Sequence, residues 1–187
     1  QRYDRQRYKK LYDLFLQHLS FFWRPEEVDL SGKEKNDYDT LTDHQKFIFT
    51  KNLGYQILLD SVQSRGISHL LDDCSNPELE AFAKTWEFFE TLHSYSYTYI
   101  IKNVYPNPSD VFDNILTDPE IIKRTSSVTK YYDDLIEKIP EDSLDDKKKK
   151  LYLTLVSINI LEGIRFYVSF ACSYCFAQNK TMEGNAK

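Results

Sequence analysis

The chain has 187 residues and a net charge of −5, with 41% hydrophobic and 28% charged residues, which is typical of a folded globular protein with one core. The acidic balance argues against a nucleic-acid-binding protein, which would present a basic face. Three cysteines favour a reducing, cytoplasmic compartment over a disulfide framework, and we expect no signal peptide and no apolar run near the roughly 20 residues that span a bilayer.

The first half of the chain contains two helical patterns. Leucines and phenylalanines recur at helical spacing over roughly 4–22. The capping-box pattern Thr42–Gln45 then predicts a second helix, over about 42–65. Gly66 follows that segment, where a glycine would serve as the C-terminal cap of a helix.

Proline marks the start of two later helices. Asn76 and Pro77 predict the cap and first turn of a third helix, which should end near Val104. The pair Asp118–Pro119 repeats this signal and predicts a fourth helix, and the longest apolar segment, about 147–178, predicts the last one.

The pattern as a whole predicts an all-α protein. Alternating hydrophobicity is rare and no Asn-Gly hairpin turn occurs. We find no internal repeat and no interdomain linker, so residues 1–187 are expected to form a single domain, a bundle of long helices with short connections.

The third predicted helix contains a candidate metal-binding face. Glu90, His93 and Tyr97 fall within an arc of roughly 60° on a helix, in an otherwise aromatic stretch. A buried carboxylate needs a compensating cation, and a metal ion is the natural candidate beside an imidazole. Glu-x-x-His alone is a weak motif, so a hydrogen-bonded polar pair without metal remains the alternative reading.

Two further acids strengthen the metal interpretation. Asp60 ends an apolar run on the second helix, with Gln56 one turn earlier as an expected hydrogen-bond partner. Glu162 lies within the most apolar helix, where Arg165 could instead form an ion pair with it. Three helices would then supply Asp, Glu-x-x-His and Glu to one site.

Other reactive residues carry weaker signals. Cys172 and Cys175 match Cys-x-x-Cys, but they lie within a predicted helix and not in a strand-to-helix turn, so we expect buried, unreactive thiols. His18, His44 and His69 have no acidic partner at matching spacing on an apolar face and are expected to be structural or exposed.

Several stretches together resemble the small, radical-generating subunit of class I (aerobic) ribonucleotide reductase. They are LSFFWRPEEVDL, NLGYQILLDSVQSRG, ETLHSYSYTYI, DPEIIKR, KYYDDLIE and LEGIRFYVSFACS, followed by MEGNAK. They cover almost the whole chain in the order expected for that family. The resemblance implies a ferritin-like helical bundle.

The resemblance also implies a di-iron carboxylate centre. Asp60, Glu90 and His93 would ligate one iron, with Glu90 placed to bridge, and Glu162 would ligate the other. A complete subunit would hold two iron ions, although manganese also suits oxygen and imidazole ligands.

A radical function follows from the same resemblance. Tyr97 matches the position of the stable tyrosyl radical, and Trp23 matches the tryptophan that carries electrons during cofactor assembly and links the radical to the partner subunit. Phe166 and Phe170 match the apolar wall around the radical. A separate large (alpha) subunit would use the radical to reduce ribonucleotides to deoxyribonucleotides for DNA replication, and the small subunit is expected to be a homodimer.

One feature of the family is not found in the sequence. The family's second Glu-x-x-His follows MEGNAK, so we expect a bundle that is incomplete at the C-terminus, lacking the last metal-binding helix, and inactive without it. Either a second polypeptide supplies that helix or the sequence is truncated. A ferritin-like di-iron oxidase or oxygenase without a radical, and a metal-free scaffold fragment, are the alternative functions.

Overall fold

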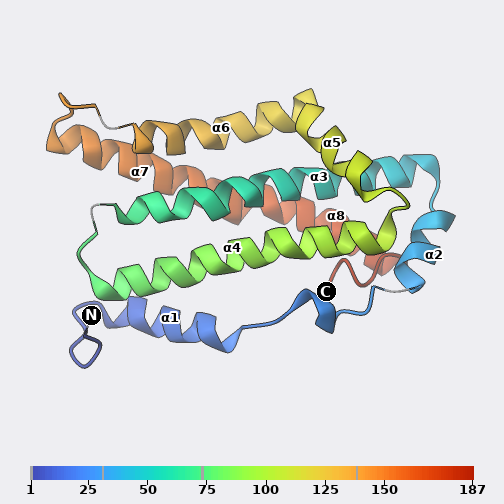
Figure 1. The fold of residues 1–187 in the computed structure, drawn as a ribbon, viewed down its shortest axis with the longest axis horizontal. Helices are drawn as coiled ribbons and strands as arrows, with labels where there is room; N and C mark the ends of the chain where they lie inside the picture. The colour runs from blue at the N-terminus through green and yellow to red at the C-terminus, as the bar shows by residue number, and fades with distance from the viewer. Residues whose placement is uncertain (1, 31, 73, 138) are drawn as a thin grey trace.

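The computed structural model describes residues 2–30, 32–72, 74–137 and 139–187, and it contains long helices aligned along one axis (Figure 1). The helices are α1 (Lys9–Ser20), α2 (Lys33–Thr40), α3 (Asp43–Gly66), α4 (Pro77–Val104), α5 (Pro108–Thr117), α6 (Pro119–Ile136), α7 (Leu144–Ile160) and α8 (Phe166–Gln178), with 3-10 turns at Pro25–Glu27 and Ile67–Leu71 and a π-helical turn at Leu161–Arg165. The described residues contain no strand, which confirms the all-α prediction.

The predicted starts of α3 and α4 are confirmed because they depend on local capping chemistry. Thr42 accepts a hydrogen bond from the backbone of Gln45, whose side chain returns one to the Thr42 backbone. Asn76 accepts a hydrogen bond from Leu79 N at 2.8 Å, with Pro77 in the first turn of α4. Both long central helices therefore begin where the sequence predicts.

The first predicted helix is shorter than expected, and two short helices were not predicted. α1 begins at Lys9 because the buried carboxylate of Glu78 accepts the backbone N–H of Arg7 at 2.7 Å, before the helix starts. α2 is almost entirely polar, and α5 is a short helix between the third and fourth predicted helices. Neither has the long apolar periodicity from which the other helices were predicted.

Gly66 does not cap a helix, so that prediction is wrong. Its φ of −82° is helical, and the chain continues directly into the 3-10 turn at Ile67–Leu71. A Cβ atom on Gly66 would lie 2.4 Å from the ring of Tyr132 on α6. The glycine is therefore required by packing between α3 and α6, not by backbone conformation.

α3 and α4 form the centre of the bundle. α1 packs on α4, while α6 and α8 pack on α3 (Figure 1). One buried cluster includes Phe49, Leu53 and Ile101, and a second cluster includes Leu59 and Leu161. These two central helices also carry the candidate metal-binding residues Asp60, Glu90 and His93.

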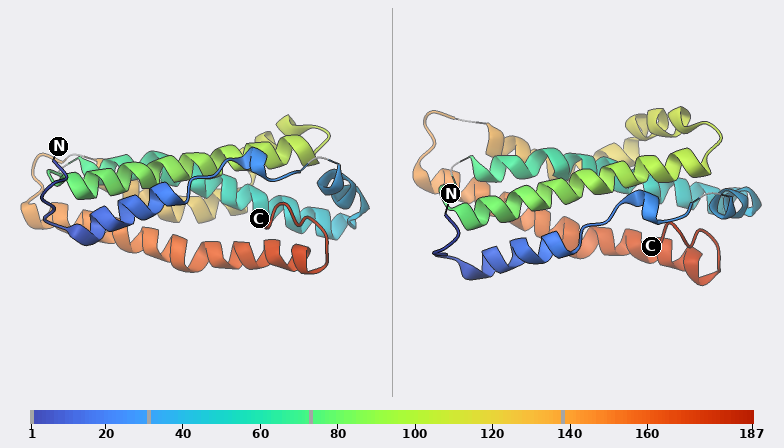
Figure 2. Two further views of the ribbon diagram at one scale, coloured as in Figure 1. Left: turned by 90° about the horizontal axis from the view of Figure 1, so that it is seen from below. Right: turned by 60° about the horizontal axis from the view of Figure 1, so that its bottom comes forward.

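α7, the π turn and α8 form one continuous run along the length of the molecule (Figure 2). Among the described residues, Leu144–Gln178 is one helix long and apolar enough to cross a membrane, so the expectation that no such run exists is wrong. Only 28% of its most apolar stretch is buried, which by itself would suit a membrane-spanning helix. Glu162 and Arg165 near the middle of the run argue against this, because charged side chains are costly inside a bilayer. Its contacts with α3 and α6 are those of a bundle helix.

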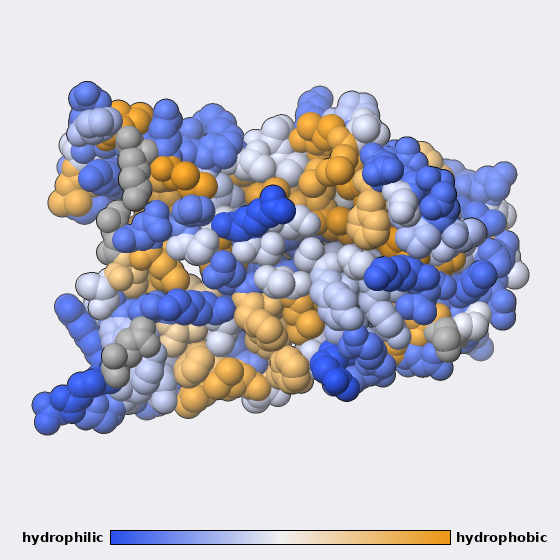
Figure 3. Space-filling model, viewed as in Figure 1, coloured by the Kyte–Doolittle hydropathy of each residue, from blue (hydrophilic) through white to orange (hydrophobic). Residues whose placement is uncertain are grey.

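Apolar side chains also reach the surface over α1 (Figure 3), where Leu16 and Leu19 are exposed, as is Phe22 just after its end. The expectation of buried thiols is wrong for Cys175, which is exposed on α8, whereas Cys172 is half-buried.

α2 holds the last residues of the chain through its acidic side chains. Asp37 accepts the backbone N–H of Met182 at 3.1 Å, and the buried carboxylate of Glu34 accepts that of Gly184 at 2.7 Å. Met182 is fully buried as a result. These contacts fix the end of the chain beside α3 and α4, where it helps to line the cavity described below.

The cap of α4 should contribute measurably to stability. We expect Asn76→Ala to lower the free energy of unfolding by about 1 kcal/mol, because the backbone N–H of Leu79 loses its acceptor. Chemical denaturation followed by circular dichroism measures the change. Asn76→Asp keeps the acceptor and should stay close to wild type, and equal stability of Asn76→Ala and wild type would contradict the capping role.

Candidate metal centre

Three acidic and imidazole side chains meet between α3 and α4. One ligand atom from each of Asp60, Glu90 and His93 lies within 4.8 Å of the others. Asp60 is 3% exposed and Glu90 is 4% exposed, so both carboxylates are removed from water. Helical spacing places Glu90 and His93 one turn apart on α4, and the antiparallel neighbour α3 contributes Asp60.

Both oxygens of Glu90 have hydrogen-bond partners on its own helix. Trp86 Nε1 donates to Glu90 Oε1 at 2.7 Å, from one turn before. Glu90 Oε2 lies 3.3 Å from His93 Nδ1, one turn after. The sequence places Trp86 on this face by its spacing, but its hydrogen bond to the carboxylate is a finding of the structure.

Tyr97 is hydrogen-bonded directly to the acidic cluster. Its Oη donates to Asp60 Oδ2 at 2.6 Å, which joins α4 to α3. Burial, followed by the charge of Asp60, raises the pKa of Tyr97 well above its usual range. The phenol is therefore held neutral, with its proton directed at a carboxylate.

Glu162 approaches the cluster from the run formed by α7 and α8 but is outside the group of closely spaced ligand atoms. It is half-buried in the π-helical turn Leu161–Arg165, an irregularity that often marks functional sites. Gln63 Nε2 donates to Glu162 Oε1 at 2.8 Å. The alternative ion pair is not formed, because Arg165 donates to Ser127 Oγ at 2.8 Å instead.

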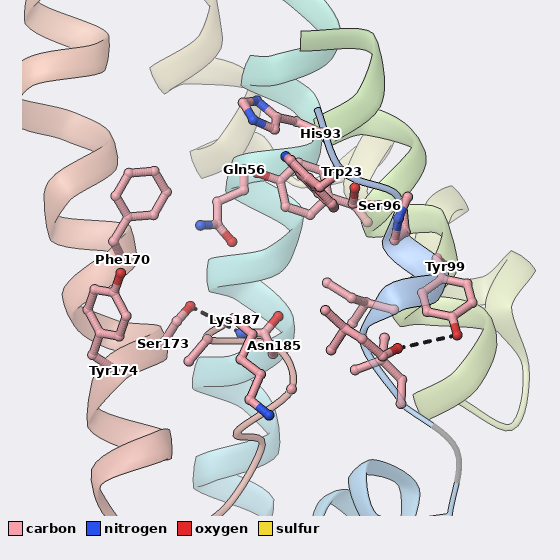
Figure 4. Close-up of a pocket in the computed structure, with 17 residues that line it drawn as sticks. Trp23, Gln56, His93, Ser96, Tyr99, Phe170, Ser173, Tyr174, Asn185 and Lys187 are labelled. Carbon is pink, nitrogen blue, oxygen red and sulfur yellow. Dashed lines mark hydrogen bonds between the residues drawn. The ribbon is translucent and has the colours of Figure 1, made fainter. Parts of the chain in front are cut away.

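A cavity of about 260 Å³ opens beside the cluster and is lined by residues of α3, α4, α8, the segment between α1 and α2, and the C-terminal segment (Figure 4). Gln56, expected to hydrogen-bond Asp60, lines this cavity, and the hydrogen bond to Asp60 that the structure shows comes from Tyr97. Trp23 also lines it, with its ring centroid 6.4 Å from that of His93.

The two phenylalanines of α8 have different positions. Phe170 lines the cavity together with Tyr97, although it is 39% exposed. Phe166 is buried behind it, with ring centroids 6.0 Å apart, in the core cluster around Leu59. Of the predicted apolar wall, Phe170 therefore shares a cavity with Tyr97, whereas Phe166 supports Phe170.

Burial and neighbouring negative charge raise the pKa of two of the carboxylates. Burial, and then the charge of Glu90, raise the pKa of Asp60 to about 8 and that of Glu162 to about 7. Burial acts to lower the pKa of His93, but the hydrogen bond to Glu90 and the other acids raise it overall. A divalent cation would remove this repulsion, and carboxylate oxygens with an imidazole nitrogen suit iron and manganese. The residues present fit such a metal.

Comparison with known proteins agrees with this chemistry. The family model described as "Ribonucleotide reductase, small chain" matches residues 2–187. The "Ribonucleoside-diphosphate reductase 1 subunit beta" of Escherichia coli O157:H7 is 50% identical over 204 aligned residues, which cover 100% of this chain and 54% of that protein. The subunit beta of Enterobacteria phage T4 is 44% identical, with 100% and 55% coverage.

Solved structures show the same fold. The "Ribonucleotide reductase R2 subunit from Clostridium botulinum" has a TM-score of 0.90 at 25% identity and covers 100% of this chain and 57% of that chain. The dimanganese(II)-NrdF of Streptococcus sanguinis has a TM-score of 0.80 at 20% identity, covering 98% and 61%. The chain thus spans about half the length of the curated relatives that it matches.

The raised pKa of Asp60 predicts how stability depends on pH when no metal is bound. Because this pKa rises from about 3.9 in an unfolded chain to about 8, the folded state holds an extra proton between these values. In the presence of a chelator, the free energy of unfolding should fall by up to about 1.4 kcal/mol per pH unit as pH increases through this window.

Chemical denaturation at intervals from pH 5 to pH 8.5 measures this slope. Asp60→Asn should make it shallower, because the amide does not titrate while Glu162, whose pKa is raised to about 7, still does, whereas Asp113→Asn, at an exposed position of α5, should leave it unchanged. Stability that increases with pH in the wild type, or an unchanged slope in Asp60→Asn, would contradict the raised pKa.

Proposed function

Because the chain belongs to the ribonucleotide reductase small-chain family, we propose that it forms the metal-binding and radical-forming part of the small subunit of ribonucleoside-diphosphate reductase. The radical would be formed on Tyr97 and used by a separate large subunit to reduce ribonucleotides to deoxyribonucleotides. The observation that supports this most strongly is the hydrogen bond from Tyr97 to Asp60, inside a buried group of metal-ligating side chains.

Asp60, Glu90 and His93 would hold one metal ion, and Glu162 would contribute to a second. When bound, such a pair of ions supplies the oxidising power, from molecular oxygen, that the side chains lack. We propose iron, with manganese as the other candidate, since the Streptococcus sanguinis relative is a dimanganese(II) protein.

Asp60 is placed to control the proton of Tyr97. Loss of an electron makes a phenol strongly acidic, so the proton on Tyr97 Oη must leave at the same time. Asp60 Oδ2, at 2.6 Å, is in position to accept it. The resulting neutral radical would be protected by the surrounding side chains, among them Phe170 and Ile100, which line the same cavity.

Trp23 and His93 offer a route for electrons between the surface and the centre. Trp23 is half-buried, and its ring lies nearly parallel to that of His93, at an angle of 29°. We propose that the large subunit exchanges electrons with the site through this pair. Homodimerisation and a cytoplasmic location are part of the same proposal, and the exposed apolar side chains of α1 offer a surface for subunit contact.

Two other functions remain to be distinguished by experiment. A ferritin-like oxidase or oxygenase without a radical would use the same ligands but would not need the hydroxyl group of Tyr97. A metal-free scaffold would need neither. The close approach of Asp60 to Glu90, at the cost of raised pKa values, favours a metal site over a scaffold.

Metal binding should depend on the buried carboxylates. We expect Asp60→Asn and Glu90→Gln each to weaken Mn(II) binding by about tenfold or more, as loss of a ligand or of its support typically does. Isothermal titration calorimetry with Mn(II) measures the affinity. Asp113→Asn is the matched control on an exposed helix, and equal affinities in all variants would contradict the assigned site.

Radical formation should depend on Tyr97. We expect the native polypeptide that carries these residues to give a tyrosyl EPR signal after exposure to Fe(II) and oxygen, and Tyr97→Phe to lose it while still binding metal. Tyr99→Phe, two residues away on the same helix, should keep the signal. A signal that survives in Tyr97→Phe would place the radical elsewhere, and turnover without any radical would favour the oxidase.

A further inference from the structure

Hydrogen bonds between side chains connect α6 to the π-helical turn that carries Glu162. Tyr132 on α6 is 3% exposed, and its Oη donates to Gln63 Oε1 at 2.6 Å. Gln63 on α3 is fully buried, and its Nε2 donates to Glu162 Oε1 at 2.8 Å. The hydroxyl group of Tyr132 is thus linked to the Glu162 carboxylate through one amide.

The chemistry of the three side chains fixes the direction of each hydrogen bond between them. Gln63 presents its NH₂ group to Glu162 and its carbonyl oxygen to Tyr132, which is the orientation that an ionised carboxylate, able only to accept hydrogen bonds, requires. That oxygen is buried and needs a donor, because a buried acceptor left unpaired is costly. Tyr132 supplies the donor. Without it, the amide could rotate and turn its oxygen toward the carboxylate.

Gly66 provides the space that this arrangement requires. It lies one turn after Gln63 on α3, and a Cβ atom there would lie 2.4–2.6 Å from three atoms of the Tyr132 ring. Any larger residue would push the ring away from α3 and separate Tyr132 from Gln63. Glycine destabilises a helix relative to alanine, and the close approach of the Tyr132 ring explains its presence here.

Glu162 needs such support more than the other acids of the site. It lies in a π-helical turn, is half-buried, and is outside the group formed by Asp60, Glu90 and His93. The hydrogen bond from Gln63 is the contact that ties its carboxylate to α3. Its orientation toward the cluster therefore depends on the orientation of one amide.

We propose that Tyr132, acting through Gln63, is a positioning residue that keeps the Glu162 carboxylate directed at the metal site, with Gly66 as the position that admits its ring. The proposal rests on the metal-binding function proposed above. It assigns Tyr132 no contact with metal, oxygen or the radical, and its effect on the site is transmitted through the amide.

The first test needs no metal. The side-chain NH₂ resonances of Gln63, in ¹⁵N-labelled protein, should shift in Tyr132→Phe, which removes the donor to Gln63 Oε1, and in Glu162→Gln, which removes the negative charge from the acceptor of Gln63 Nε2. Tyr105→Phe is the matched control: Tyr105 is also buried, and its Oη lies 2.7 Å from Thr50 Oγ1, outside the site. Unchanged Gln63 resonances in Tyr132→Phe would overturn the proposal.

The second test connects the chain of hydrogen bonds to metal binding. Tyr132→Phe should weaken Mn(II) binding by up to about tenfold, the lower end of what loss of a hydrogen bond to a ligand causes, because Tyr132 acts through Gln63, while Tyr105→Phe should leave it unchanged. In a Gln63→Met background, adding Tyr132→Phe should have no further effect, because the connection is already broken. A Tyr132→Phe effect of the same size in both backgrounds would contradict transmission through Gln63.

The two tests separate this proposal from the proposed function. If the wild type bound no Mn(II), the metal-binding function would be wrong, but the Gln63 resonances would still decide whether the hydrogen bonds orient Glu162. If the wild type bound Mn(II) and Tyr132→Phe bound it equally well, the function would stand and the positioning role of Tyr132 would be wrong.

Discussion

The burial of Asp60 and Glu90 beside each other is the constraint on which the rest of the site depends. Two carboxylates removed from water repel each other unless cations or hydrogen-bond donors compensate. The surrounding helices supply donors one by one: Tyr97 to Asp60, Trp86 to Glu90 and Gln63 to Glu162. These donors leave the group still short of positive charge, as the raised pKa of Asp60 indicates, and a divalent metal would complete the compensation.

The long helices hold these acids at fixed positions because their ends are well defined. α3 and α4 begin at capping residues, and their contact with each other brings Asp60 to Glu90 and His93 from different parts of the chain. The short helix α2 then holds the end of the chain beside the same site through Glu34 and Asp37. The architecture serves to hold a few polar atoms in an apolar interior.

Local chemistry explains what the sequence could predict. The starts of α3 and α4 depend on side chains within one turn, and the pairing of Glu90 with His93 follows from helical spacing alone. Asp60 and Glu162 could be recognised because acids within apolar helices are rare. Trp23 was assigned from the family resemblance, and the structure places it beside His93.

Contacts between distant residues explain what the sequence could not predict. Gln56 and Gln63 lie on either side of Asp60 at helical spacing, so the sequence does not distinguish their roles. The packing of the other helices places Gln63 against Glu162 and leaves Gln56 lining the cavity. Gly66 has the sequence pattern of a helix cap, but the Tyr132 ring from α6 gives it a different role. The π turn at Leu161–Arg165 likewise has no sequence signal that distinguishes it from the helix around it.

The most direct measurement of the central claim is anomalous diffraction from crystals of the protein grown with Mn(II). We predict an anomalous peak within coordinating distance of Asp60, Glu90 and His93, with the Tyr97 hydroxyl still directed at Asp60. A peak bound elsewhere, with these three side chains retaining only their mutual hydrogen bonds, would contradict the claim that their burial exists to hold a metal.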